Sequence, residues 1–244
     1  MCQIFNRTNT FQVAILSNSP YLTQQFCGGA LISEKHVLTS ASCAYFAYYY
    51  VVYVHLGDTI LGNEMDVTYT NTIAVTNFFI HQDYVNEFPY SSSNIAILEM
   101  AEPVPLDLYP NIKPACLPDQ GTDFMGYTAT LSGWGLDGVN GYNTWLHEAQ
   151  LSVVADEQCF GISPSEICAT GTLQGSEAPC VRDDGGALVI SDPNINNNGL
   201  TVAGIISVED CYEGETYTRV SFFVNWINGI IGDTATCPPP QSTK

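Results

Sequence analysis

The sequence predicts an all-β protein that carries one helix near its C-terminus. Short runs rich in β-branched and aromatic residues recur between turn residues, at 11–16, 51–56, 95–98 and 200–206. This spacing is typical of a β-barrel or a β-sandwich. The stretch 221–231 instead carries apolar residues at helical spacing, with Ser221 as the expected cap and Gly232 as the expected end.

The size and composition of the chain fit a single folded domain. It has 244 residues, of which 45% are hydrophobic, and all-β domains of this length commonly form one unit. No apolar run reaches the roughly 18 residues of a membrane-spanning helix. The first seven residues hold no apolar signal region, so we expect a mature or recombinant form whose secretion signal has been removed. Residues 233–244 are expected to form a polar, proline-rich tail.

The charge of the chain is strongly acidic. There are 25 acidic and 6 basic residues, which give a formal net charge of −19. Such a surface repels nucleic acid and anionic membranes, because both are bound through Lys and Arg, so we expect neither as a partner. Two interpretations remain open: the charge serves solubility, or the scarcity of Lys and Arg protects the chain in a fluid rich in proteases that cut after basic residues.

The nine cysteines indicate an oxidising compartment, and we therefore expect a secreted, extracellular protein. They form no paired Cys-x-x-Cys motif and the four histidines are scattered, so we expect no metal and no cofactor. Because nine is odd, at least one thiol is free or bonded to another molecule. The sequon at Asn6 is a candidate glycosylation site and fits secretion.

Five tyrosines stand close together in the first quarter of the chain, at positions 45, 48, 49, 50 and 53. Aromatic side chains bury large apolar areas, and they pack in strands and cores more often than they form ligand platforms. We therefore expect these tyrosines to pack within a strand and the core.

Seven motifs follow one another along the chain: CGGALI at 27–32, LTSASC at 38–43, NIAIL at 94–98, KPACLP at 113–118, SGWG at 132–135, CVRDDGGAL at 180–188 and YTRV at 217–220. In this order they resemble the signatures of the chymotrypsin/trypsin-like serine protease family, and they cover about residues 11–231. The resemblance implies two packed antiparallel six-stranded β-barrels, at about 8–110 and 116–220, and a C-terminal helix at about 221–231. All three lie in one homology domain, 1–232.

The resemblance also locates the family's catalytic triad, in which a serine attacks, a histidine takes its proton and an aspartate orients the histidine. The three positions hold Ser42 for the histidine, Asn94 for the aspartate and Asp184 for the serine. Ser42 cannot act as a base near neutral pH, Asn94 carries no charge, and Asp184 is a weak nucleophile. Losing such a unit costs on the order of 10⁶ in turnover. We therefore expect no catalytic residues.

Two neighbours of Asp184 also bear on catalysis. Arg182 stands where the family has a glycine that turns the oxyanion-hole amide. We expect it to form an ion pair with Asp184 rather than point into solvent. Asp183 matches the aspartate that receives a new N-terminal amine after activation, but the chain has no Ile-Val-Gly-Gly motif. Asp183 must therefore find another partner or keep a zymogen-like arrangement.

The resemblance places four residues at the base and walls of the family's specificity pocket: Ala178, Val208, Glu209 and Glu215. The family keeps glycine near the last two positions so that a substrate side chain can enter. We expect the two carboxylates to block the pocket, and the alternative is an acidic pocket for a basic group.

The resemblance implies four disulfides, which are Cys27–Cys43, Cys159–Cys168, Cys180–Cys211 and Cys2–Cys116. The remaining cysteine, Cys237, lies in the proline-rich tail. It is expected to be either a free thiol or the link of a disulfide-bonded dimer.

These observations lead us to expect a secreted, non-catalytic serine protease homologue that acts as a protein-binding, regulatory or decoy molecule. Its charge should steer a basic protein partner toward it. Two alternatives stay open: a structural or abundant secretory protein without a specific ligand, and a hydrolase with a rebuilt active site.

Overall fold

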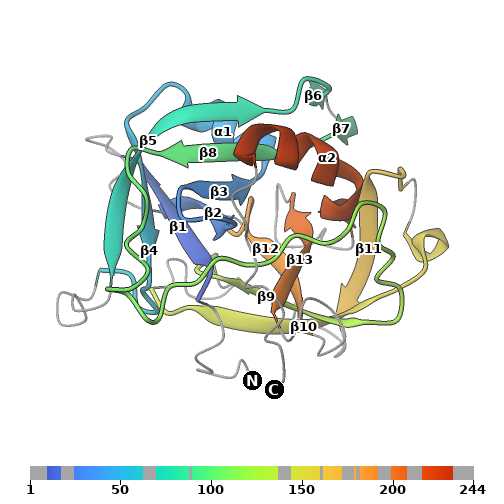
Figure 1. Cartoon of the computed structure of the whole chain (residues 1–244). Coiled ribbons are helices and arrows are strands. Elements are labelled where there is room, and N and C mark those ends of the chain that lie inside the picture. The colour runs from blue at the N-terminus through green and yellow to red at the C-terminus, as the bar shows by residue number, and fades with distance from the viewer. Residues whose placement is uncertain are drawn as a thin grey trace, which may run out of the picture.

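The structure is a computed structural model that describes residues 10–17, 25–62, 70–87, 90–136, 144–159, 162–171, 179, 182–191, 199–207 and 216–232. Its strands form two closed six-stranded antiparallel β-barrels, as predicted, and Figure 1 shows the C-terminal helix lying between β8 (Ala96–Met100) of the first barrel and β11 (Glu166–Gly171) of the second. Each described strand of a barrel pairs with a neighbour on both sides, so closure leaves no open sheet edge among these strands.

The first barrel has the strand order β1-β2-β3-β8-β5-β4. Its strands are β1 (Gln12–Ser17), β2 (Gln25–Leu31), β3 (His36–Thr39), β4 (Val52–Leu56), β5 (Asn71–Ile80) and β8 (Ala96–Met100). Strand β4 shows the alternating pattern that favours a barrel strand. Val52, Val54 and Leu56 alternate with less buried residues and point into the barrel core. Helix α1 (Ala41–Ala47) follows β3, and a two-stranded sheet of β6 (Val85–Glu87) and β7 (Tyr90–Ser92) precedes β8.

The second barrel has the strand order β10-β11-β14-β13-β12-β9. Its strands are β9 (Thr128–Gly133), β10 (His147–Val153), β11 (Glu166–Gly171), β12 (Ala187–Ser191), β13 (Leu200–Ile206) and β14 (Thr216–Arg219), and the short 3-10 helix η2 (Asp156–Gln158) follows β10. A second apolar cluster fills this barrel, with Tyr217 as its largest fully buried ring.

A third apolar cluster lies between the barrels and unites residues of both with the C-terminal helix α2 (Val220–Ile231). Buried hydrogen bonds join the barrels as well: Gln12 Nε2 donates to Ser132 O at 3.1 Å, and Ser132 Oγ donates to Gln12 Oε1 at 3.0 Å. The candidate site described below lies at this junction.

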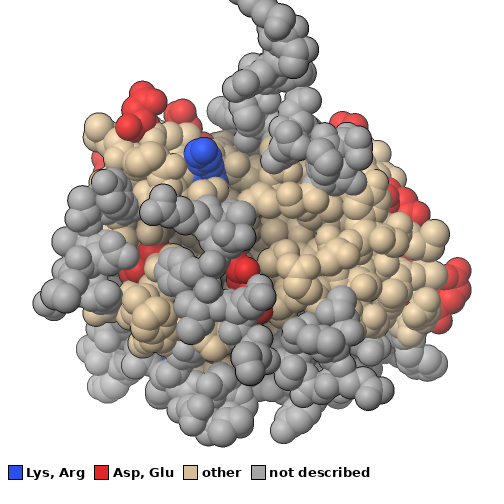
Figure 2. Space-filling view, turned by 90° about the horizontal axis from the view of Figure 1, so that it is seen from below, with Lys and Arg blue, Asp and Glu red and all other residues tan. Residues whose placement is uncertain are grey.

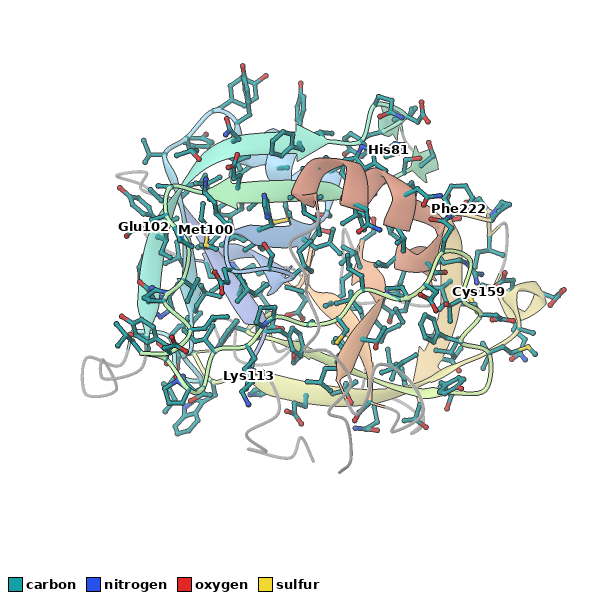
Figure 3. All side chains as sticks on the ribbon, viewed as in Figure 1. His81, Met100, Glu102, Lys113, Cys159 and Phe222 are labelled. Carbon is teal, nitrogen blue, oxygen red and sulfur yellow. A yellow bond between two sulfur atoms is a disulfide. The ribbon has the colours of Figure 1, made fainter. Side chains whose placement is uncertain are left out.

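Helix α2 begins one residue earlier than predicted and without the predicted cap. Arg219 is the N-cap residue and makes no side-chain capping bond. Ser221 is buried and donates instead to Thr122 O at 2.8 Å, so its hydroxyl anchors the helix to the segment between the barrels. The predicted end at Gly232 is confirmed: its φ of +63° is reached without the cost that a Cβ brings. Figure 3 shows Phe222 on the outer side of α2 and His81 beside the helix.

The prediction that the tyrosine cluster packs in the core was wrong. Tyr45 is 53% exposed, Tyr48 70%, Tyr49 67% and Tyr50 41%, while Tyr53 in β4 is half-buried. The reason is helix α1, which the strand-like composition did not predict. Its buried face consists of small residues, Ala41, Cys43, Ala44 and Ala47, and the large rings therefore lie on the outer side of the helix and in the turn after it.

Among the charged side chains on the face shown in Figure 2, acidic groups outnumber basic ones. On the face shown in Figure 2, red acidic groups occur at several separate places and a blue basic group at one. Within the part of the chain that the structure describes, no helix has both the length and the apolar character needed to cross a bilayer.

Candidate functional site

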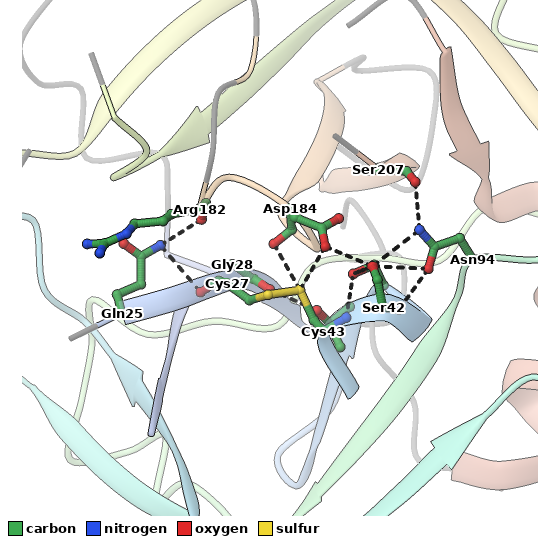
Figure 4. The surroundings of a disulfide bond; sticks show 11 residues. Gln25, Cys27, Gly28, Ser42, Cys43, Asn94, Arg182, Asp184 and Ser207 are labelled. Atoms are coloured by element: carbon green, nitrogen blue, oxygen red, sulfur yellow. Dashed lines mark hydrogen bonds between the residues drawn. A yellow bond between two sulfur atoms is a disulfide. The ribbon is translucent and has the colours of Figure 1, made fainter. Parts of the chain in front are cut away.

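The structure brings together the three positions that the triad resemblance singled out. Ser42 lies in the first turn of α1, Asn94 just before β8, and Asp184 just before β12, so two come from the first barrel and one from the second. Ser42 Oγ donates to Asp184 Oδ2 at 2.8 Å, and Ser42 N donates to Asn94 Oδ1 at 2.9 Å (Figure 4). The three side chains therefore form one hydrogen-bonded group at the barrel junction.

Helix α1 holds Ser42 in place through its cap. Ser40 Oγ accepts a hydrogen bond from Cys43 N at 3.2 Å, which satisfies one of the free N–H groups at the start of the helix. Ser40 Oγ also lies 2.9 Å from Ser42 Oγ. The backbone of Asp184 is fixed from the other barrel, because its carbonyl oxygen accepts from Gly28 N at 2.8 Å.

Asn94 connects Ser42 to the second barrel. Its side-chain Nδ2 donates to Ser207 Oγ at 2.6 Å, and its main-chain carbonyl oxygen accepts from Thr218 Oγ1 at 3.0 Å. The sequence analysis did not find Ser207 or Thr218. Ser207 is the first polar residue after the apolar run of β13, which is the signal that would have marked it. An amide suits this position, because it accepts from Ser42 and donates to Ser207 at once.

No imidazole takes part in the group. All four histidines lie within the described residues, and their hydrogen bonds are made elsewhere: His36 with Ser33, His55 with Thr72 and Asp58, and His81 with Asp83 N. His147 belongs to β10. Burial lowers the pKa of His36 and of His81 below the ordinary value of 6.5, which favours their neutral forms. The nearest hydrogen-bond partners of the Ser42 hydroxyl are thus the Asp184 carboxylate and the Ser40 hydroxyl, and not an imidazole.

The predicted ion pair between Arg182 and Asp184 was wrong. Where both partners are described residues, the ion pairs are Lys35–Glu99, His55–Asp58, His81–Asp83 and Arg219–Asp156. Figure 4 shows the Arg182 side chain directed toward Gln25 and the Asp184 carboxylate turned to Ser42. Gln25 Nε2 donates to Arg182 O at 3.1 Å, which holds the arginine on that side of the loop.

Asp183 is buried, and one of its partners is the backbone of the SGWG motif. Its Oδ1 accepts from Gly135 N at 2.8 Å. A Cβ on Gly133 or on Gly135 would overlap the Asp183 carboxylate, so the two glycines form the space that the side chain occupies. The SGWG motif therefore has a direct structural role here, which is to accept this acid between its glycines.

Two of the disulfides implied by the resemblance are formed, Cys27–Cys43 and Cys159–Cys168. Cys116 is disulfide-bonded as well, and its predicted partner Cys2 lies outside the described residues. Cys27, Cys43 and Asp184 bring ligand atoms within 4.8 Å of one another. Because the disulfide uses both sulfur atoms, this group offers no thiolate to a metal.

Comparison with known proteins decides the family. The family model named Trypsin matches residues 4–227, which is nearly the whole chain. The chain belongs to the trypsin family. Over 223 residues it is 32% identical to brachyurin of Leptuca pugilator, covering 86% of this chain and 89% of that protein.

Other relatives of this trypsin-family chain differ in length. It is 29% identical to serine protease SSP1 of Scolopendra subspinipes, covering 82% of this chain and 71% of that protein. It is 29% identical to serine protease filzig of Drosophila melanogaster, covering 86% of this chain and only 13% of that protein. The chain thus matches most of the shorter relatives and a small part of the longest.

Several predicted features of the trypsin-family site lie outside the described residues. These are the pocket positions Ala178, Val208, Glu209 and Glu215, the disulfide Cys180–Cys211, the cysteines Cys2 and Cys237, the sequon at Asn6 and the tail 233–244. They stay predictions.

The backbone of Arg182 allows a first test of the site. Its φ is +81°, in the region where the trypsin family's glycine fits and where a Cβ costs roughly 1–2 kcal/mol. We expect Arg182→Gly to be more stable than Arg182→Ala by about 1 kcal/mol, because both variants remove the long side chain and only alanine keeps the Cβ. Urea unfolding of the two variants measures the difference. Equal stability would show that the left-handed backbone carries no strain at this position.

Proposed function

We propose that this member of the trypsin family is a secreted, non-catalytic homologue that binds a protein partner and does not cleave it. The observation that carries the proposal is the group of Ser42, Asn94 and Asp184. These residues hydrogen-bond to one another at the barrel junction, at the positions where the family resemblance implies histidine, aspartate and serine.

The chemistry of this group supports the proposal. A serine hydroxyl becomes a useful nucleophile when a base near neutral pKa takes its proton. The nearest acceptors within reach of Ser42 Oγ are the Asp184 carboxylate at 2.8 Å and Ser40 Oγ at 2.9 Å, and both groups are weaker bases than imidazole. Such weak bases remove a hydroxyl proton poorly at neutral pH, and His36, His55 and His81 form their hydrogen bonds elsewhere.

Secretion is supported by the disulfides. Cys27–Cys43 and Cys159–Cys168 are both formed, and such bonds persist in oxidising compartments and are rare in the cytosol. The proposal of a basic partner rests on the net charge of −19, which favours encounters with cationic proteins.

The test is a search for proteolysis by the unmodified protein. We expect no hydrolysis of a broad panel of peptide substrates and no labelling by an active-site serine probe, measured by fluorescence and by mass spectrometry. Hydrolysis that survives inhibitors of contaminating proteases would contradict the proposal. If Ser42→Ala then abolished that hydrolysis, the chain would instead be a hydrolase rebuilt around the bond between Ser42 and Asp184.

A rebuilt variant serves as the control for this test. Ser42→His, Asn94→Asp and Asp184→Ser together restore the residue types of the triad. We expect this triple variant to gain little activity, because Arg182 still places a side chain where the family has glycine. Robust hydrolysis by the triple variant would show that these three positions alone set the difference.

A further inference from the structure

The outer side of α1 and the turn after it carry an exposed aromatic patch, which we define as Tyr45, Phe46, Tyr48, Tyr49, Tyr50 and Val51. All six side chains are at least 40% exposed, and Tyr48 and Tyr49 reach 70% and 67%. Soluble proteins bear isolated exposed apolar residues routinely, but a contiguous group of this kind marks an interaction site. Packing within the fold does not require these exposed rings, because the small residues of α1 form its buried face.

The rings of the patch are arranged before any partner arrives. Phe46 contacts Phe26 and Tyr50, with ring centroids 5.4 and 5.2 Å apart, and Tyr48 contacts Phe78 at 6.4 Å. Tyr49 meets Tyr45 edge-on at 6.0 Å. A side-chain hydrogen bond with Tyr45 raises the pKa of Tyr49, which favours the neutral form of the Tyr49 phenol. A partner therefore meets ring faces that need little ordering, which limits the entropic cost of binding.

The segment of the chain that carries this patch contains no Lys or Arg. Between Lys35 and Lys113 there is no Lys or Arg, although this segment supplies α1 and all strands from β3 to β8. The same segment holds eight acidic residues: Asp58, Glu64, Asp66, Asp83, Glu87, Glu99, Glu102 and Asp107. Lys35 itself is paired with Glu99 at 2.7 Å. The rings thus belong to a segment that contains acidic residues and no Lys or Arg.

We propose that the aromatic patch docks an arginine-rich segment of a protein partner. A guanidinium group stacks flat on a tyrosine ring and is attracted by its negative face, and it is less strongly hydrated than the ammonium of lysine. The net charge of −19 attracts such a segment from a distance and repels a second copy of this chain, which is the other candidate occupant. This inference rests on the proposed binding function and names its surface and the chemistry of its partner.

The patch also adjoins the candidate site. Tyr45 and Phe46 share the seven-residue helix α1 with Ser42, whose hydroxyl is bonded to Asp184. Consequently, a segment docked on the rings would lie within about one helix length, roughly 10 Å, of the barrel junction.

The experiment is a calorimetric titration of the full chain with a short peptide of alternating Arg and Gly, which measures the affinity of the peptide for the chain. We expect Tyr48→Ala/Tyr49→Ala to weaken binding about 5- to 30-fold, because two cation–π contacts at exposed sites are lost. Tyr48→Phe/Tyr49→Phe keeps both rings and should bind within about 2-fold of the unmodified chain. Leu108→Ala removes an equally exposed side chain, 70%, outside the patch, and should change nothing.

Matched probes separate stacking from simple charge. A Lys-Gly peptide of equal charge should bind more weakly than the Arg-Gly peptide, and a Glu-Gly peptide should not bind. Near 1 M salt, where the screening length falls to about 3 Å, the difference between the alanine and phenylalanine variants should persist. Equal binding by those two variants, or self-association of the chain through these rings, would overturn the inference. Recovery of cleaved peptide would instead contradict the proposed lack of catalysis and leave the patch assignment standing.

Discussion

Replacing Gly185 with alanine should lower the free energy of unfolding by about 2 to 5 kcal/mol, the largest effect we expect from one added methyl group. Gly185 has a φ of +79°, where a Cβ is strained in any surroundings. The added Cβ would also overlap Thr39 Oγ1, and it would lie 2.6 Å from Gly28 O and 3.2 Å from Cys43 Sγ. The backbone and the disulfide cannot move aside without disturbing the candidate site.

The matched control is Gly229→Ala in helix α2. A Cβ at Gly229 meets nothing within 4 Å, and alanine is the better helix former by about 0.8–1 kcal/mol, so this variant should be more stable than the unmodified chain. Urea unfolding of both variants measures the two opposite effects. If Gly185→Ala unfolded at the same urea concentration as the unmodified chain, the loop around Asp184 would be far more adaptable than its contacts indicate.

Removing the disulfide of the site with Cys27→Ala/Cys43→Ala should cost about 3 kcal/mol, because this bond closes a loop of 16 residues in the unfolded chain. It also fixes α1 to β2, so the variant should lose affinity for the Arg-Gly peptide at the aromatic patch. Denaturant unfolding and the peptide titration give the two readouts.

The control for this variant is Cys159→Ala/Cys168→Ala, which opens a loop of 9 residues in the second barrel. It should cost nearly as much stability, roughly 2.5 kcal/mol, and leave peptide binding unchanged. If both variants lost peptide binding to the same extent, the effect would reflect general destabilisation and α1 would not depend on its own disulfide.

The barrels and the C-terminal helix were predictable because their signals are local or carried by family motifs. The run at 200–206 became β13, and Gly232 ends α2 as expected. Helix α1 was not predicted, since its rings favour strands when taken one at a time and only the small residues on its inner face indicate a helix. The prediction that Ser221 caps the helix was wrong because its hydroxyl donates to the carbonyl oxygen of Thr122, which is distant in the sequence.

The members of the candidate site could be named from the sequence, but their bonds could not. Ser42, Asn94 and Asp184 come together from positions 42, 94 and 184, and only the fold shows that Ser42 donates to Asp184. The expected partner, Arg182, is two residues from Asp184 in the chain. Sequence proximity suggested the ion pair, yet Arg182 has a left-handed backbone and its side chain is directed toward Gln25.

The bond between Ser42 and Asp184 also affects what single substitutions toward a Ser-His-Asp triad would do. Asp184→Ser alone removes the carboxylate that accepts from Ser42, Ser42→His alone removes the hydroxyl, and Asn94→Asp alone removes the N–H that donates to Ser207. Each step breaks an existing bond, while a catalytic unit yields most of its benefit only when its members are all present. On the proposal that this chain is non-catalytic, we therefore expect the three positions to be epistatic, because each single change toward the triad loses a bond before the full catalytic unit is present.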